Sequence, residues 1–227
     1  ENAGKFYVTT PIYYVNDVPS IGHAYTTVAA DILARWHKLL GENVFFLTGS
    51  DEHGIKIQKR AAELGKEPKK FCDGIVAEFK KTWELLGIDY DNFIRTTDSG
   101  HIKAIQHAVQ KLYDSGFIYK GRYKEFYCSG CEQYKTSSEL VDGKCPLHQK
   151  DAELRDEDAY LFKLSSFQDK LLDVISKGKF QILPKERKNE IVSFLEKEKL
   201  KDVCISRRKE EVPWGIEIPF DKKYTLY

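Results

Sequence analysis

Residues 11–23 decide the fold, and they read Pro-Ile-Tyr-Tyr-Val-Asn-Asp-Val-Pro-Ser-Ile-Gly-His. Residues 6–10, immediately before them, have the composition of a short apolar strand, and helix-spaced apolar residues follow. Ser20 is the predicted N-cap of that helix. Gly22 and His23 then fall in its first turn, where free backbone N–H groups and the helix dipole favour an anion. The stretch therefore predicts a helix start suited to a phosphate, although a lone histidine in a first turn is common without a nucleotide.

Strand and helix patterns alternate through the first half of the chain. The predicted strands are residues 6–10, 43–48 and 92–96, the predicted helices are residues 20–40, 68–86 and 99–116, and residues 49–54 read as a loop. This alternation predicts an α/β fold, in which a parallel sheet has helices on its faces and binds ligands beyond the carboxyl ends of its strands. Tyr14, His23 and Asp51 all fall on that side.

Three of the five cysteines form a pattern with a histidine. Cys128-Ser-Gly-Cys131 is followed, after thirteen residues, by Cys145-Pro-Leu-His148. Two such pairs can close a tetrahedron about zinc. A redox Cys-x-x-Cys needs no second pair, and three cysteines with a histidine cannot make two disulfides. Because protein groups fill all four positions, the zinc is predicted to be structural.

The composition indicates a globular chain without membrane association. Of 227 residues, 41% are apolar, and no apolar run approaches the roughly 18 residues of a membrane span. The amino terminus lacks a secretory pattern. A net charge of +1 gives no argument for nucleic acid. Cys72 and Cys204 are predicted to be buried thiols, and this cysteine usage indicates a reducing compartment, the cytoplasm.

The sequence pattern changes at Phe117. Residues 117–209 are richer in charge and short turns, contain the cysteine pairs, and carry a predicted strand at residues 160–164 and helices at residues 166–176 and 185–198. This region is interpreted as an inserted module.

Several segments carry a further signal. Residues 20–23 read Ser-Ile-Gly-His, residues 9–16 read Thr-Thr-Pro-Ile-Tyr-Tyr-Val-Asn, and residues 47–54 read Leu-Thr-Gly-Ser-Asp-Glu-His-Gly. Phe-Ile-Arg-Thr-Thr, Ile-Ser-Arg and Val-Pro-Trp-Gly-Ile follow later in the chain. Taken in their order along the chain, these segments resemble those of the methionyl-tRNA synthetases. This is a family of class I aminoacyl-tRNA synthetases with the signature His-Ile-Gly-His. Ser20 departs from that signature, because serine can cap the helix and contact a phosphate but cannot supply an imidazolium.

The resemblance implies an enzyme, a methionine–tRNA ligase. It would activate methionine with ATP, bound with magnesium, to methionyl-adenylate and pass the methionyl group to tRNA(Met). No nucleophile or general base is needed, because the protein aligns the reactants and stabilises charge. The implied site residues are Asp51 for the amino group of methionine, Ile12 and Tyr14 for its side chain, and Ser20, Gly22 and His23 for ATP, with His23 and Ser20 as the catalytic pair.

The resemblance also implies a domain plan. A Rossmann-like catalytic fold would be interrupted by a connective-peptide insertion with zinc knuckles. Residues 1–116 would form the first half of the catalytic domain, residues 117–209 the insertion, and residues 210–227 the return. The Lys-Met-Ser-Lys-Ser loop and the anticodon-binding domain of the family are absent from the sequence. The chain therefore looks like an amino-terminal portion of the enzyme.

Two other kinds of protein fit parts of the sequence. One is a zinc-knuckle RNA-binding module derived from a synthetase without catalysis, and the other is a nucleotidyltransferase acting on a small substrate. Without its flanking motif, Asp51 would be a loop-capping aspartate, and Ile12 and Tyr14 would be ordinary core residues. Residues 9–16 together with Asp51 specify an amino-acid pocket, which argues against both.

Overall fold

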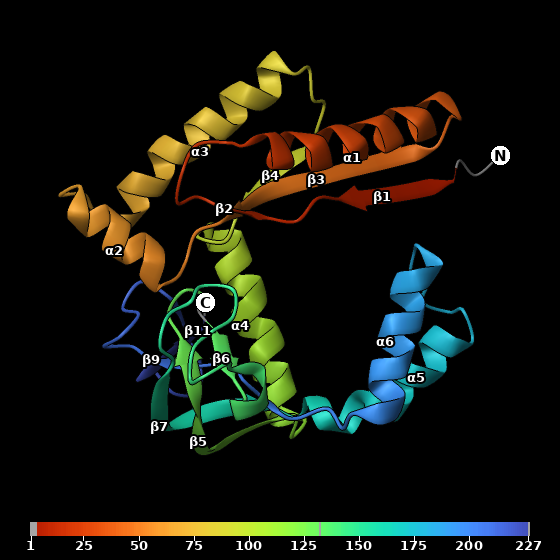
Figure 1. The fold of residues 1–227 in the computed structure, drawn as a ribbon. Helices are drawn as coiled ribbons and strands as arrows, with labels where there is room; N and C mark the ends of the chain where they lie inside the picture. The colour runs from red at the N-terminus through yellow and green to blue at the C-terminus, as the bar shows by residue number, and fades with distance from the viewer. Residues whose placement is uncertain (1–3, 132, 227) are drawn as a thin grey trace. The chain divides into compact units, whose positions relative to one another are not determined.

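The computed structural model describes residues 4–131 and 133–226, which form two compact units (Figure 1). The first unit lies within Glu1–Gln106 and Glu211–Ile216, and the second within His107–Glu210 and Glu217–Leu226. Within the described residues the chain passes between them inside α4 (Ser99–Asp114), between Glu210 and Glu211, and within β10 (Ile216–Glu217). The domain boundaries expected at residues 116 and 209 remain predictions.

The first unit is built on a parallel sheet whose central strand is β3 (Asn43–Asp51). On one side β3 pairs first with β1 (Lys5–Thr9) and then with β2 (Tyr13–Tyr14), and on the other side with β4 (Asn92–Arg95). Pro11 lies between β1 and β2 and has no N–H to donate, so the ladder is interrupted there. The α/β class with a parallel sheet is thereby confirmed.

Helix α1 (Ile21–Leu39) packs along β1 and β3, as Figure 1 shows. Ala30 and Ala34 meet Phe46 of the sheet, and their small side chains allow the helix to approach closely. The second core cluster lies between β2, β4 and two further helices, α2 (Ile55–Glu63) and α3 (Pro68–Leu85). Its largest buried side chains are Trp83 and Phe79.

Two expectations about the sheet are wrong. β3 continues through Asp51 instead of ending at residue 48, because its pairing with β4 and β2 extends to the Ser50 and Asp51 positions. A Cβ at Gly49 would lie 2.1 Å from the carbonyl oxygen of Ile94, so only glycine permits this approach. The sheet is also not covered on both faces within the described residues, since Tyr7 and Phe45 are exposed on the face away from α1.

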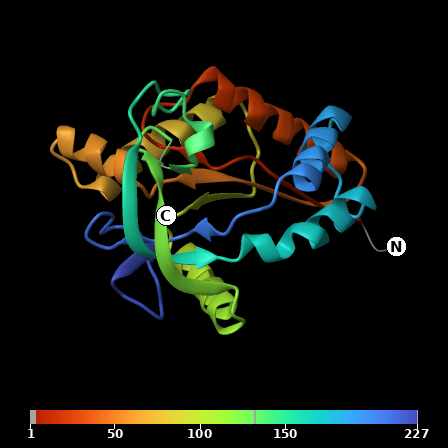
Figure 2. The same cartoon turned by 60° about the horizontal axis from the view of Figure 1, so that its bottom comes forward.

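The second unit contains a long antiparallel ribbon. β5 (Ile118–Cys128) pairs with β7 (Glu153–Phe162) along its length, flanked by β6 (Gln133–Lys135) and β8 (Val203–Cys204) (Figure 2). The remaining elements are the 3₁₀ turns Ser137–Glu139 and Leu164–Phe167, helices α5 (Gln168–Ser176) and α6 (Lys185–Lys197), and strands β9 (Arg207–Arg208) and β11 (Tyr224–Leu226).

The long predicted helices are confirmed, with ends that shift by a few residues, and α2 was not predicted. The strand expected at residues 160–164 is the end of β7, and β5 was missed altogether. In β7 charged residues occupy both faces from Glu153 to Asp158, which hides the alternation typical of a strand, whereas in β5 exposed Lys120, Arg122 and Lys124 do alternate with less exposed residues and the signal was overlooked. No helix within the described residues is long and apolar enough to span a bilayer.

Candidate active site and metal centre

Tyr14 and Asp51 lie side by side at the carboxyl edge of the sheet. They are register partners in the parallel pairing of β2 with β3. Tyr14 is 54% exposed and Ile12 is 41% exposed, so neither is an ordinary core residue. Asp51 is half-buried and is the last residue of β3, not part of a loop. This edge therefore presents an aromatic, an aliphatic and a carboxylate side chain to the surroundings.

Tyr13 fixes this edge to α1. It points the opposite way from Tyr14, as alternation along a strand requires, and it is buried. Its hydroxyl lies 2.9 Å from Oγ1 of Thr27, and its ring centroid lies 4.8 Å from that of His23. The start of α1 is thereby held beside the strand that carries Tyr14.

The start of α1 has the predicted form, with Ser20 at the N-cap and Gly22 and His23 in the first turn. The backbone N–H of Ser20 donates to Nδ1 of His23 over 3.0 Å. Burial lowers the pKa of His23, so the neutral ring is favoured at pH 7. Because Nδ1 accepts a hydrogen bond, the proton of the neutral ring lies on Nε2, which can donate to a ligand.

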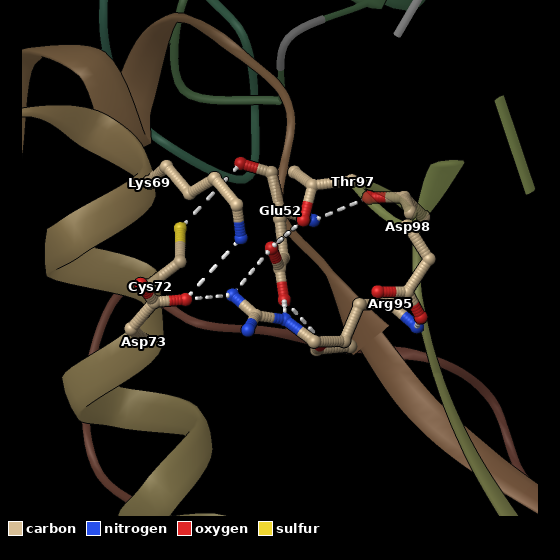
Figure 3. A network of polar contacts seen from close by, with 9 residues as sticks. Glu52, Lys69, Cys72, Asp73, Arg95, Thr97 and Asp98 are labelled. Carbon is tan, nitrogen blue, oxygen red and sulfur yellow. Dashed lines mark hydrogen bonds and ion pairs between the residues drawn. The ribbon is translucent and has the colours of Figure 1, made fainter. Parts of the chain in front are cut away.

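Directly after Asp51 lies a buried ion pair that the sequence patterns did not predict (Figure 3). The side chain of Glu52 is fully buried, and its two carboxylate oxygens accept hydrogen bonds from three residues. Nε of Arg95 donates to Oε1 over 2.6 Å and Nη2 donates to Oε2 over 3.0 Å, while the hydroxyls of Ser50 and Thr97 each donate over 2.6 Å.

The same guanidinium group binds a second carboxylate. Nη2 of Arg95 lies 2.6 Å from Oδ1 of Asp73, and Figure 3 shows the guanidinium between the two acids. Burial opposes the charge of Arg95, but its hydrogen bonds to Glu52 and Asp73 outweigh this and raise its pKa. The hydrogen bond from Arg95 lowers the pKa of Asp73. Both residues are therefore charged at neutral pH.

His53 and Cys72 complete the buried groups near this edge. Burial lowers the pKa of His53 to about 4 and raises that of Cys72 to about 12, so both are neutral at pH 7. The ring of His53 lies 5.2 Å from that of Trp214, whose Nε1–H donates to the carbonyl of Gly54. Cys72 is buried as predicted, whereas Cys204 is only half-buried.

The second unit contains a Cys/His cluster, formed by Cys128, Cys131, Cys145 and His148. Their three Sγ atoms and one imidazole nitrogen all lie within 4.8 Å of one another. Sγ of Cys131 is 3.5 Å from Sγ of Cys145 and 3.4 Å from Nδ1 of His148. A tetrahedral zinc ion separates such ligand atoms by roughly 3.6–3.8 Å.

The backbone of the cluster is shaped for this approach. A Cβ at Gly130 would lie 2.4 Å from Cγ of His148, so the first turn of the cluster admits only glycine. Burial raises the pKa of Cys131 to about 11, whereas the hydrogen bond with His148 lowers that of Cys145 to about 6. The donor set and its spacing fit zinc, and all four positions come from protein.

The sequence patterns predicted the site residues of the sheet edge, the helix start and the cluster, but they did not predict the Glu52–Arg95 pair. The signal was present in the segments Asp-Glu-His-Gly and Phe-Ile-Arg-Thr-Thr, which contain the two residues. They are 43 residues apart, so only the pairing of β3 with β4 shows that they meet.

Comparison with known proteins gives consistent matches along the whole chain. The family model described as tRNA synthetases class I (M) matches residues 6–153 and 135–227. The methionine–tRNA ligase of Caldanaerobacter subterraneus subsp. tengcongensis is 49% identical over 98% of this chain and 34% of its own length. That of Streptomyces coelicolor is 46% identical over 100% of this chain and 43% of its own length.

A solved structure agrees with these matches. Mycobacterium tuberculosis methionyl-tRNA synthetase in complex with methionyl-adenylate superposes with a TM-score of 0.92 and 35% identity, covering 99% of this chain and 44% of that one. The chain thus spans a third to less than half of the length of these relatives. The family model matches nearly all residues of this chain, and the structure contains a parallel sheet. The chain therefore belongs to the class I tRNA synthetases (M).

Proposed function

We propose that this chain is the amino-terminal part of a methionine–tRNA ligase. The enzyme would join methionine to ATP, giving methionyl-adenylate and pyrophosphate, and then transfer the methionyl group to tRNA(Met). The observation that carries the proposal is the pairing of Tyr14 with Asp51 at the carboxyl edge of the sheet, beside a helix start that carries His23. The similar Mycobacterium tuberculosis enzyme, titled as a complex with methionyl-adenylate, supports the choice of ligand.

Asp51 binds the ammonium group of methionine in this proposal. Its neighbour Glu52 is also an acid, but the carboxylate of Glu52 is buried and already accepts hydrogen bonds from Arg95, Ser50 and Thr97. Asp51 is half-buried at the strand end, and its side chain is turned to the face opposite that of Glu52. Ile12 and Tyr14, exposed on the same edge, would form part of the pocket for the thioether side chain.

Ser20, Gly22 and His23 bind ATP in this proposal. Gly22 leaves the first turn of α1 open to a phosphate, and Nε2–H of His23 would donate to it as charge develops during attack of the methionine carboxylate on the α-phosphorus. The side chain of Ser20 would offer a hydroxyl. Magnesium would accompany ATP as part of the substrate.

The Cys/His cluster would hold a structural zinc ion. It has no open position for an activated water, so its role would be to stabilise the second unit, which contains the proposed connective-peptide insertion of residues 117–209. Residues 1–116 and 210–227 would belong to the catalytic domain. Three thiolate ligands need reduced cysteines, which supports a cytoplasmic location.

Exposed apolar residues on two sides of the first unit support the assignment to a longer protein. Tyr7 and Phe45 lie exposed on one sheet face, and Ile32, Leu33 and Trp36 lie exposed along α1. Parallel sheets are normally covered on both faces. The remainder of the enzyme would cover the sheet face that carries Tyr7 and Phe45.

The test is ATP–pyrophosphate exchange by the full-length protein with each of the twenty amino acids. Exchange that depends on methionine alone is the expected result. Exchange with a different amino acid would overturn the pocket assignment. RNA binding without any exchange would indicate instead a synthetase-derived RNA-binding module.

A further inference from the structure

Glu52 is unusual because it is a charged side chain without any exposed surface, placed directly beside the proposed substrate-binding acid. A buried carboxylate is costly unless it is paired and its acceptor positions are filled. Here Arg95, Ser50 and Thr97 fill them all at 2.6–3.0 Å. Well-packed apolar residues often replace buried ion pairs without loss of stability, so a pair at this position calls for a reason beyond stability.

Contacts with the Glu52 carboxylate and with Thr96 hold the backbone on both sides of Asp51. Before Asp51, the hydroxyl of Ser50 donates to the Glu52 carboxylate and the carbonyl of Ser50 accepts from Thr96. After it, the N–H of Glu52 donates to Oγ1 of Thr96 over 2.9 Å. The end of β3 is thereby fixed to the segment that follows β4.

The geometry also determines the direction of the Asp51 side chain. Side chains two residues apart in extended backbone lie on the same face, and the hydrogen bond from Ser50 to Glu52 is such a contact. The side chain of Asp51, between them, is therefore turned to the opposite face. Arg95 extends the bracing, because it also binds Asp73 of α3, as Figure 3 shows.

We propose that Glu52 and Arg95 are positioning residues, whose buried ion pair holds the carboxylate of Asp51 in the orientation that receives the ammonium group of the amino-acid substrate. The inference rests on the proposed function. The pair does not touch the substrate, and it acts only through Asp51. A displacement of a binding group by about 1 Å can cost on the order of a hundredfold in rate, which sets the size of the expected effect.

The experiment measures ATP–pyrophosphate exchange by the full-length protein and its Glu52→Gln variant, with active sites titrated so that only folded enzyme is counted. Gln keeps the shape of Glu52 but presents an N–H group to a guanidinium that needs an acceptor. We expect kcat/KM for methionine to fall by about tenfold to a hundredfold, while KM for ATP changes less than about twofold. Thr97→Val removes one hydrogen bond from Glu52, and we expect a change of the same kind that is smaller.

The matched control is Asp31→Asn. Asp31 is another buried acid of the first unit, and it binds Arg35 over 2.6 Å and the backbone N–H of Asp89 over 2.9 Å. Its loss should lower the melting temperature without altering kcat/KM for methionine. If Glu52→Gln and Thr97→Val behave like this control, the pair is only structural and the inference is overturned.

A double variant separates positioning from other effects. In an Asp51→Asn background, Glu52→Gln should cause little further loss, because there is no longer a carboxylate to orient. If the two substitutions lower kcat/KM independently, so that their fold-losses multiply, the inference is contradicted. The proposed function is tested separately on the unaltered protein, since absence of methionine-dependent exchange there would remove both proposals, whereas exchange with insensitive Glu52 variants would remove only this one.

Discussion

The carboxyl edge of the parallel sheet and the Cys/His cluster are both polar sites, but they are held together in different ways. At the sheet edge, Arg95 neutralises Glu52 and the surrounding hydroxyls complete its hydrogen bonds. In the cluster, three cysteine sulfur atoms and an imidazole nitrogen lie within 4.8 Å of one another. The first site is complete from protein groups alone, whereas the second needs a cation to hold its thiolates together. The comparison indicates that pre-organisation comes from buried pairing in one unit and from metal binding in the other.

The largest expected effect tests the metal-dependent side of this comparison. Cys145→Ser removes one zinc ligand, and structural zinc sites contribute roughly 10 kcal/mol or more of binding free energy at neutral pH. We expect loss of zinc and faster proteolysis between residues 128 and 152, with zinc measured by atomic absorption. Cys204→Ser is the control, because Cys204 lies outside the cluster and its loss should leave the zinc content unchanged. Absence of zinc from the unaltered protein would refute the metal assignment.

The next effect tests the ligand side of the sheet edge. Asp51→Ala removes the acid proposed for the ammonium group, and loss of a charge-assisted hydrogen bond costs about 2–3 kcal/mol, or roughly a hundredfold in kcat/KM for methionine. KM for ATP should change little. Steady-state exchange assays with either substrate varied would show this, and an unaltered KM for methionine would exclude Asp51 from the pocket. Asp31→Asn is the matched comparison, because Asp31 is a buried acid that binds Arg35 and the backbone of Asp89, and KM for methionine should stay unchanged in this variant.

The pH dependence of unfolding tests whether His53 is held buried and neutral beside the sheet edge. Burial lowers the pKa of His53 from 6.5 to about 4, so the unfolded chain takes up the proton first as pH falls. The stability that neutral His53 contributes is present above about pH 6.5 and is lost progressively towards about pH 4, amounting to about 2 kcal/mol after allowance for partial solvent screening. Urea unfolding at several pH values would measure it.

His53→Gln should flatten that pH dependence, whereas the same change at the exposed His107 should leave its slope intact. An equal slope in His53→Gln and the unaltered protein would show that His53 does not charge on unfolding.

The smallest effect concerns Ser20, where the family signature has histidine. Ser20→His should alter the rate of methionine activation by less than about fivefold, because the backbone N–H of Ser20 already orients His23 whichever side chain stands there. Pyrophosphate exchange measures the rate, and Ser20→Ala separates loss of the hydroxyl from gain of the ring. A rise of more than about tenfold on restoring histidine would mean that this position limits the reaction.

Much of the fold was predictable because its signals are local. Ser20 and Pro68 start helices where capping and proline geometry allow, and a glycine follows each of α1 and α3 at Gly41 and Gly87. By contrast, the extent of β7 depends on its partner strand, because charged residues from Glu153 to Asp158 lie on both of its faces and only the pairing with β5 shows that they belong to a strand. The extent of β3 was likewise set by its neighbours, which pair with it as far as Asp51.

The sequence by itself determined the starts of α1 and α3, the parallel α/β plan and the four residues of the Cys/His cluster, where short turns bring together the two ligands of each pair. Only the tertiary structure decided that Ile12 and Tyr14 are exposed, that Asp51 ends a strand, and that Glu52 meets Arg95. The physical reason is range. Capping and knuckle geometry act over a few residues, whereas burial and the pairing of charges 43 positions apart exist only once the sheet has formed.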